Sequence, residues 1–377
     1  MDGRSLFGRC NACVYLPSTA VREVHCFKCI TVRLASHPLP FDWLDMLNDE
    51  LKSLSESACS MITEASAVAE KLARDLASVA SISKDDKSPV TVADFAVQAI
   101  VGLRLRDCPI VDMVGEEDAS RLRTDDFLLQ EVLTAVRTAI PEAQADDILE
   151  AIDSGNHEGG PTGCFWTLDP IDGTKGFLRG GQFALALALI NDGIVEMGVL
   201  GLSHWGLHGD PSGATVRPPG SICLAIRGAG AQGWSVDQPD EVTQLKVADW
   251  NADSILRTCE SVESGHSSHD ASASIVEIFS GHEAVRLDSQ TKYAVVAAGA
   301  ADAYLRLPTR PGYIERIWDH AAGAIVATES GAIVSDIHGQ ELDFSHGLGL
   351  EKNRGVICSV PGAHQRIIDR IAEIGLS

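Results

Sequence analysis

The chain has 377 residues and carries 53 Asp and Glu against 30 Lys and Arg, which gives a formal net charge of −23. An acid excess of this size excludes duplex nucleic acid as the expected partner, because neutralising phosphates requires clustered Lys and Arg, and it equally disfavours an anionic membrane surface. Apolar residues make up 45% of the chain, and no apolar run approaches the roughly 20 residues that span a bilayer. We therefore expect a core-forming protein inside the cell, without nucleic-acid or membrane partners.

Residues 1–40 differ in composition from the rest of the chain. This leader carries five Lys and Arg against two acids, and it holds two Cys-x-x-Cys pairs, Cys10/Cys13 and Cys26/Cys29. The spacing is close to that of a zinc ribbon, whereas the acid-poor, unpatterned sequence also suits an organellar transit segment or a disordered extension. These three interpretations stay open. A transit segment would direct the protein to a chloroplast or mitochondrion; otherwise we expect it in the cytoplasm.

Residues 41–241 are predicted to form an α+β half. Apolar residues at spacings of three and four indicate a long first helix, and Thr91 with Asp94 resembles a capping box that opens a second. Asn191-Asp192-Gly193 between two apolar runs is typical of a β-hairpin. The predicted elements in chain order are helices 42–81 and 91–106, strand 110–114, helix 126–138, and strands 165–168, 183–190, 194–200, 222–226 and 234–236.

Residues 242–377 are predicted to form an α/β half, because strand patterns there alternate with helix patterns. The expected strands are 255–259, 285–287, 303–307 and 332–335, and the expected helices are 268–280, 290–300 and 319–330. Gly331 is placed to end the last helix. The fold class is therefore α/β, with two halves packed together.

The segment Trp166-Thr-Leu-Asp169-Pro-Ile-Asp172-Gly-Thr174-Lys175-Gly176 carries the strongest chemical signal. Its two carboxylates lie three residues apart around a turn that should follow a strand, so they can converge on one cation. Gly173 permits tight backbone geometry there, with amide groups free to face an anion. Hard carboxylate oxygens without neighbouring His or Cys favour Mg²⁺ over zinc.

Three further acids are candidates for the same site. Glu116 follows the predicted strand 110–114, and Asp319 in Trp318-Asp-His begins a predicted helix. For Asp94 and Asp319, taken singly, an ordinary role as helix N-cap is the favoured interpretation. Glu116 alone would be an ordinary solvated loop acid.

Taken together, these segments resemble the inositol-monophosphatase superfamily of Mg²⁺-dependent, lithium-sensitive phosphatases. The resemblance rests on Asp94 in Ser88-Pro-Val-Thr-Val-Ala-Asp94, on Glu116, on the run 169–174 and on Trp318-Asp319, which occur in the family's order over about residues 42–370. It implies a five-layered αβαβα sandwich like that of inositol monophosphatase and fructose-1,6-bisphosphatase.

The resemblance also implies roles for these acids. Glu116, Asp169 and the backbone carbonyl of Ile171 would bind a first Mg²⁺, and Glu116 would help with a third ion where one is present. The second Mg²⁺ would be bound by Asp169, Asp172 and Asp319. Asp94, paired with the hydroxyl of Thr174, would orient and deprotonate the attacking water. The cofactor is therefore expected to be two or three Mg²⁺ per active site.

Within the superfamily, the chain is most similar to the plant and fungal 3′(2′),5′-bisphosphate nucleotidase group. Lys175-Gly-Phe-Leu-Arg179 stands where inositol phosphatases usually continue with Thr-Asn-Phe, and Leu287-Asp-Ser-Gln-Thr-Lys292 and Tyr304-Leu-Arg306 are nucleotidase-like. The substrate contacts that this implies are Gly173, Thr174, Lys175, His269, Ser289, Lys292, Arg306 and Asp319. Of these, Ser289, Lys292 and Arg306 would hold the second, non-reacting phosphate, and His269 would lie near the nucleoside. An ordinary structural role for His269 and surface charge for the two cations are the alternatives.

The function that follows is removal of the 3′-phosphate from adenosine 3′,5′-bisphosphate, and also from its sulfated form, 3′-phosphoadenosine 5′-phosphosulfate. Two alternatives stay open: an inositol phosphate phosphatase, and a catalytically silent binder that senses phosphonucleotides. The full set of acids disfavours the silent binder, since sensing needs only the phosphate contacts. We expect a monomer.

Overall fold

The computed structural model describes residues 21–26, 30–35, 49–78, 88–207, 218–262, 269–308, 310 and 312–376. The chain divides into two compact units, Met1–Leu39 and Pro40–Ser377. The first contains the antiparallel strands β1 (Val21–Cys26) and β2 (Ile30–Ala35). Cys10, Cys13 and Cys29 lie outside the described residues, as does the side chain of Cys26. The zinc, transit and extension interpretations of the leader stay predictions.

The second unit begins with two helices, α1 (Asp49–Ser78) and α2 (Ser88–Leu105). Two more, α3 (Asp126–Val136) and α4 (Ala145–Asp153), follow its first strand. The predicted apolar stripe of α1 is confirmed, since Leu54, Ala58, Ile62 and Ala65 are buried. The predicted capping box is wrong. Helix α2 already begins at Ser88, so Thr91 and Asp94 lie inside it.

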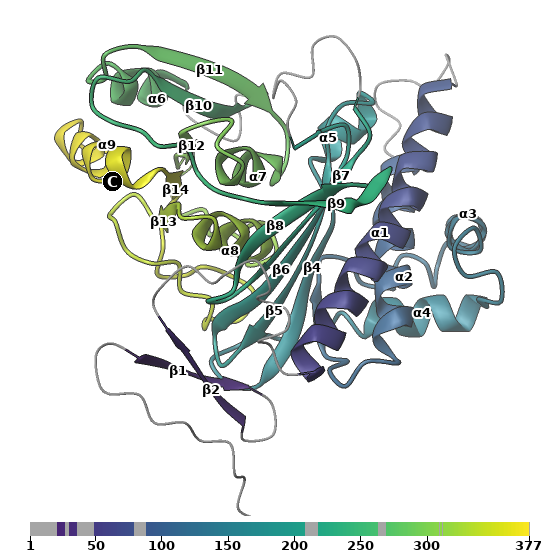
Figure 1. Ribbon diagram of the computed structural model, residues 1–377. Coiled ribbons are helices and arrows are strands. Elements are labelled where there is room, and N and C mark those ends of the chain that lie inside the picture. The colour runs from purple at the N-terminus through teal and green to yellow at the C-terminus, as the bar shows by residue number, and fades with distance from the viewer. Residues whose placement is uncertain are drawn as a thin grey trace, which may run out of the picture. The chain divides into compact units, whose positions relative to one another are not determined.

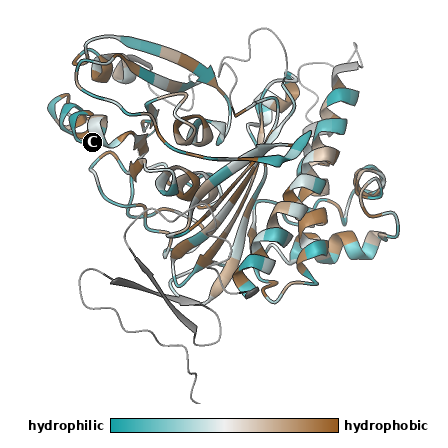
Figure 2. Ribbon diagram, in the orientation of Figure 1, coloured by the Kyte–Doolittle hydropathy of each residue, from teal (hydrophilic) through white to brown (hydrophobic). Residues whose placement is uncertain are grey.

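A seven-stranded sheet lies against α1 and α2. Its order is β3 (Met113–Gly115), β4 (Cys164–Asp172), β5 (Ala184–Asn191), β6 (Ile194–Leu202), β7 (Ser221–Ile226), β8 (Gly230–Ser235) and β9 (Gln238–Gln244). Strands β3 and β4 are parallel, and every later pair is antiparallel. The predicted hairpin is confirmed, with Asp192 and Gly193 both at positive φ, as a tight β-turn of this kind requires. Figure 2 shows how hydrophobic the central strands of this sheet are.

A five-stranded sheet forms the second half. Its order is β11 (His282–Leu287), β10 (Leu256–Ser261), β12 (Ala303–Arg306), β14 (Val356–Ser359) and β13 (Ile333–Ser335). The first three strands are parallel, and β14 is antiparallel to both of its neighbours. The remaining helices are α5 (Thr174–Leu178), α6 (His269–Val276), α7 (Thr291–Ala297), α8 (Ala321–Glu329) and α9 (Pro361–Glu373).

The predicted five-layered sandwich is confirmed. Helices α1 and α2 contact the outer face of the seven-stranded sheet, and α8 contacts β5, β6 and β7 from the other side. Helix α7 contacts α8 and also β10 and β12, whereas α9 contacts β14 and α6. Two helices therefore lie between the two sheets (Figure 1). Position in the middle layer explains why Ala321–Ala327 of α8 is buried all round. No helix in the described part of the chain is both long enough and apolar enough to cross a bilayer.

Candidate metal centre and phosphate site

The ends of β3 and β4 place three acids side by side. Gly115 of β3 pairs in parallel with Leu168 of β4, so Glu116 and Asp169 follow at the same edge. The predicted turn after residue 168 is wrong, because β4 continues through Asp172. Its register against β5 slips by one residue between Asp169 and Asp172, as in a β-bulge. Residues i and i+3 of a regular strand face opposite sides, and the extra residue brings both carboxylates to one side.

Helix α2 brings a fourth acid to this edge. Asp94 is buried, and one turn further along α2 the side chain of Gln98 binds the loop that follows β3. Its Nε2 donates to the carbonyl of Glu117 at 2.6 Å, and its Oε1 accepts from the Glu117 amide at 3.0 Å. Gln98 therefore fixes the Glu116–Glu117 segment relative to Asp94.

The fifth acid, Asp319, comes from the segment before α8. The interpretation of Asp319 as an N-cap is wrong, because His320 occupies that position. Neither Asp319 nor Asp94 caps a helix, so the carboxylate of each can serve this cluster of acids. The electrostatic interactions of Asp319 with Asp172 and Glu116 place it in the same cluster.

Repulsion between neighbouring carboxylates raises pKa values in the acid cluster, which we define as Asp94, Glu116, Asp169, Asp172 and Asp319. Burial, and then the charges of neighbouring acids, raise the pKa of Asp94 and of Asp169 well above the usual range. Desolvation, and then the charge of Asp319, raise the pKa of Glu116 to about 7, although the residue as a whole is exposed and solvent screens part of this effect. Burial also raises the pKa of Asp172, and Lys292 opposes that rise. The folded chain therefore concentrates negative charge that a cation would neutralise.

The donor set fits a hard divalent cation. Asp169 is 3% exposed, and its Oδ1 is buried without any hydrogen-bond partner. A buried carboxylate oxygen left in this way is costly unless something positive binds it. All five side chains offer carboxylate oxygens, which Mg²⁺ prefers. Orphaned oxygen, crowding of acids and donor type all point to a metal here.

These pKa shifts predict a pH-dependent stabilisation by Mg²⁺. Because the folded pKa of Glu116 lies above its unfolded value, the fold binds more protons, and stability falls as pH rises from about 4.5 to about 7. Mg²⁺ competes with those protons, so we expect it to raise the melting temperature more at about pH 7.5 than at about pH 5. Thermal melts with EDTA and with Mg²⁺ at both pH values would measure this. An equal shift at both would contradict the prediction.

A tight loop joins the end of β4 to α5. Gly173 has φ +89°, and a Cβ there would lie 3.0 Å from the Cβ of Ser289. Ser289 itself has φ +65°, and its hydroxyl is 2.8 Å from that of Thr291. Gly173 and Ser289, both predicted to contact substrate, therefore lie next to each other, although they come from different halves of the chain. Thr174 and Lys175 are exposed.

The predicted pairing of Thr174 with Asp94 stays a prediction. The Thr174 hydroxyl lies 3.5 Å from the carbonyl oxygen of Ile171, the predicted backbone ligand. Helices α2 and α5, which carry Asp94 and Thr174, do contact each other.

Two cations face the acid cluster. Lys292 is 4% exposed, and burial lowers its pKa to about 8, with the charge of Asp172 acting in the opposite direction. Arg306 Nη2 lies 2.7 Å from Glu315 Oε2 and 3.4 Å from Asp319 Oδ2. Neither cation is a solvated surface charge, so that alternative is wrong for both. His269 is the first residue of α6, and its side chain lies outside the described residues.

Two residues that shape the site were not predicted. Gln290 donates its backbone amide to Asp172, while its side chain bonds the Trp318 carbonyl at 2.8 Å and the Gly323 amide at 2.9 Å. Glu315 binds Arg306. In the sequence, Gln290 stands out only by following Ser289, and Glu315 only as an acid four residues before Asp319. Neither belongs to a motif with a characteristic spacing, so the sequence could not assign a role to either.

Glu315, Asp319 and His320 also offer ligand atoms within 4.8 Å of one another. Glu315 already contacts Arg306 and His320, so we interpret this trio as a polar network around Arg306 rather than a second metal site.

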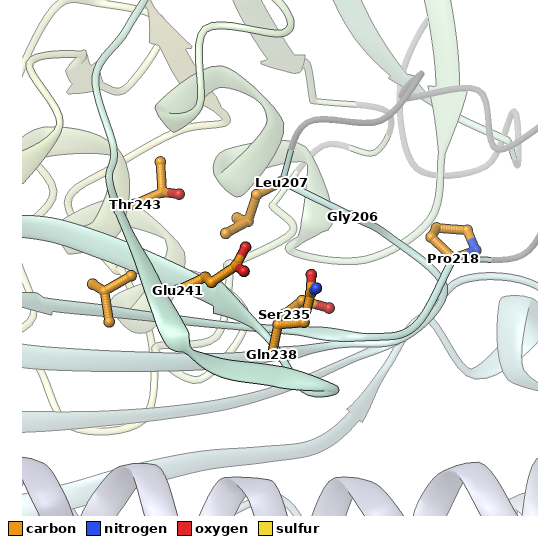
Figure 3. Close-up of a pocket in the computed structure, with 8 residues that line it drawn as sticks. Gly206, Leu207, Pro218, Ser235, Gln238, Glu241 and Thr243 are labelled. Carbon is orange, nitrogen blue, oxygen red and sulfur yellow. The ribbon is translucent and has the colours of Figure 1, made fainter.

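A separate cavity of about 330 Å³ lies where β8 and β9 meet the segment after β6 (Figure 3). Its lining includes Leu207, Pro218, Ser235, Gln238 and Glu241. None of the predicted site residues lines it, and it plays no part in the site described above.

Comparison with known proteins agrees with the fold. A family model described as the inositol monophosphatase family matches residues 50–375. A 3′(2′),5′-bisphosphate nucleotidase of Emericella nidulans is 37% identical over 321 residues, covering 78% of this chain and 90% of that protein. One of Oryza sativa is 39% identical over 344 residues, covering 84% and 94%. The solved structure of Mycobacterium tuberculosis SuhB superimposes with a TM-score of 0.54 at 19% identity, covering 87% of this chain and 99% of that one. The chain belongs to the inositol monophosphatase family.

Proposed function

We propose that this protein is a metal-dependent phosphatase that removes the 3′-phosphate of adenosine 3′,5′-bisphosphate, giving AMP and inorganic phosphate. It would act in the same way on 3′-phosphoadenosine 5′-phosphosulfate. The names of the fungal and plant relatives support this substrate class. The observation that carries it in this chain is the pair of cations beside the acid cluster, the buried Lys292 and the partly buried Arg306. A second phosphate requires such charges, whereas an inositol ring does not.

The acid cluster would hold the metal. Glu116, Asp169 and the Ile171 carbonyl are proposed for one Mg²⁺, and Asp169, Asp172 and Asp319 for a second, with Glu116 assisting a third where one binds. When bound, the metal supplies positive charge for the reacting phosphate and lowers the pKa of water. The orphaned Oδ1 of Asp169 supports its proposed place in both sets.

The chain's own groups would orient the reactants and move the proton. Asp94 is the proposed general base, which accepts the proton of the attacking water while Thr174 holds its carboxylate in place. Burial next to Glu117 and Glu116 raises the pKa of Asp94, which strengthens it as a base toward that water. Gly173 leaves room for the phosphate to approach the backbone.

Substrate selection is assigned to the groups opposite the acids. Ser289, Lys292 and Arg306 are proposed to hold the 5′-phosphate, and Lys175 and His269 to contact the rest of the nucleotide. The guanidinium of Arg306 offers a fork that matches phosphate oxygens, and the partly buried setting strengthens each charged hydrogen bond.

A phosphate-release assay tests this proposal. Adenosine 3′,5′-bisphosphate, inositol 1-phosphate and inositol 1,4-bisphosphate would each be supplied with Mg²⁺, and again with added Li⁺. We expect Mg²⁺-dependent, Li⁺-inhibited release from the adenosine bisphosphate. Release from the inositol compounds alone would identify an inositol phosphatase instead, and nucleotide binding without release would identify a silent binder.

The roles of the two halves of the chain and the oligomeric state are also proposals. We propose that residues 41–241 carry most metal ligands and residues 242–377 the nucleotide-phosphate contacts. We also propose that the protein acts as a monomer.

A further inference from the structure

We propose that Glu315 is a positioning residue that sets the preference for a second phosphate by fixing Arg306 in place. The inference rests on the proposed function and adds to it a residue that touches neither the substrate nor the metal. Glu315 lies in the segment between β12 and α8 and is 6% exposed.

Glu315 stands in the middle of a buried chain of polar contacts. Its Oε2 lies 2.7 Å from Arg306 Nη2 and 3.2 Å from His320 Nε2. His320 is completely buried, and its Nδ1 lies 2.8 Å from the hydroxyl of Tyr293 in α7. The chain Tyr293–His320–Glu315–Arg306 therefore ties the guanidinium to α7 and to the start of α8. Such a network restricts the orientation of each member more than a single pair does.

Arg306 has a competing partner. The same Nη2 atom lies 3.4 Å from Asp319 Oδ2, a longer contact than the one to Glu315. Without the charge of Glu315, the guanidinium would turn toward Asp319, its other carboxylate contact among the described residues. That movement would draw it away from the position proposed for the 5′-phosphate. Glu315 thus keeps Arg306 at the phosphate contact.

Glu315 acts through Arg306 rather than on the substrate. Its carboxylate is buried, and the same oxygen serves both Arg306 and His320. The role therefore predicts a change in KM confined to substrates that carry the phosphate Arg306 binds. General damage to the fold would instead change the kinetics of every substrate.

The test compares adenosine 3′,5′-bisphosphate with 3′-AMP, which lacks the second phosphate. For Glu315→Gln we expect KM for the bisphosphate to rise about tenfold, the effect of weakening one charge-assisted hydrogen bond, with kcat changed less than about twofold. Kinetics on 3′-AMP should be unchanged. Tyr293→Phe, which removes only the far end of the chain, should raise the same KM about threefold.

Asp302→Asn is the matched control. Asp302 is also buried and also pairs with an arginine, Arg257 at 2.6 Å, but that pair is not part of the proposed site. This variant should lower stability and leave the ratio of the two KM values unchanged. A Glu315→Gln enzyme that keeps the wild-type ratio would overturn the positioning role alone. A wild-type enzyme with equal KM for both substrates would overturn the contact of Arg306 with the second phosphate and this inference with it. A wild-type enzyme that releases no phosphate from adenosine 3′,5′-bisphosphate would overturn the proposed function.

Discussion

Asp169→Asn is expected to lower turnover by at least about a thousandfold while making the metal-free protein more stable. Asp169 is the most enclosed acid of the cluster, and its Oδ1 has no hydrogen-bond partner. Neighbouring negative charges raise the pKa of Asp169 because they oppose its ionised form. Asparagine removes that repulsion from the fold, but it also removes the charge that the proposed metal sites share.

The two effects have opposite signs, so they separate metal binding from folding. Thermal melts in EDTA would measure the stability, and phosphate release across a Mg²⁺ titration would measure the activity. Asp112→Asn, at an exposed acid just before β3, is the control and should change neither. A variant that is less stable without metal, or that keeps wild-type turnover at ordinary Mg²⁺ concentrations, would show that Asp169 does not bind the metal.

Asp94→Asn is expected to fold and to bind Mg²⁺ normally while losing about a hundredfold to ten-thousandfold in turnover, the range that a general base contributes. Asp94 comes from α2 rather than from the strand ends, and its proposed role is to accept a proton. Asparagine keeps the shape of the side chain and cannot accept that proton.

The measurement pairs turnover with Mg²⁺ affinity. The ion concentration at half-maximal activity should match wild type in Asp94→Asn and should rise in Asp169→Asn. Near-normal turnover in Asp94→Asn would show that the base lies elsewhere, and a large loss of Mg²⁺ affinity would make Asp94 a ligand.

Most helices and strands could be predicted in the right order, because the spacing of their apolar residues indicates the face that each element buries. Sequence reasoning missed β9, whose residues are almost all exposed and therefore carry no alternation. It also missed α5, a single short turn of helix in the glycine-containing loop, and like β9 this helix is held by its neighbours rather than by its own pattern. Strands β1, β2 and β14 and helices α4 and α9 were not predicted either.

The candidate site was predictable where a residue type and its spacing carried the chemistry. Asp169 and Asp172 were found together, although the reason they converge is a bulge within β4 that no local pattern revealed. The capping interpretations of Asp94 and Asp319 failed because helix starts are set by tertiary packing as well as by local residues. Glu315 could not be assigned at all, since its meaning depends on Arg306, which reaches it from a strand of the five-stranded sheet.

In the proposed site, acids from separate segments meet around shared divalent ions. Crystals grown with Mn²⁺, a substitute for Mg²⁺ with anomalous scattering, would show whether they do. We expect at least two anomalous peaks among Glu116, Asp169, Asp172 and Asp319, each about 2.0–2.5 Å from carboxylate oxygens, with Asp169 touching both. Peaks found only elsewhere, or an Asp169 carboxylate that contacts no ion at saturating Mn²⁺, would contradict this expectation.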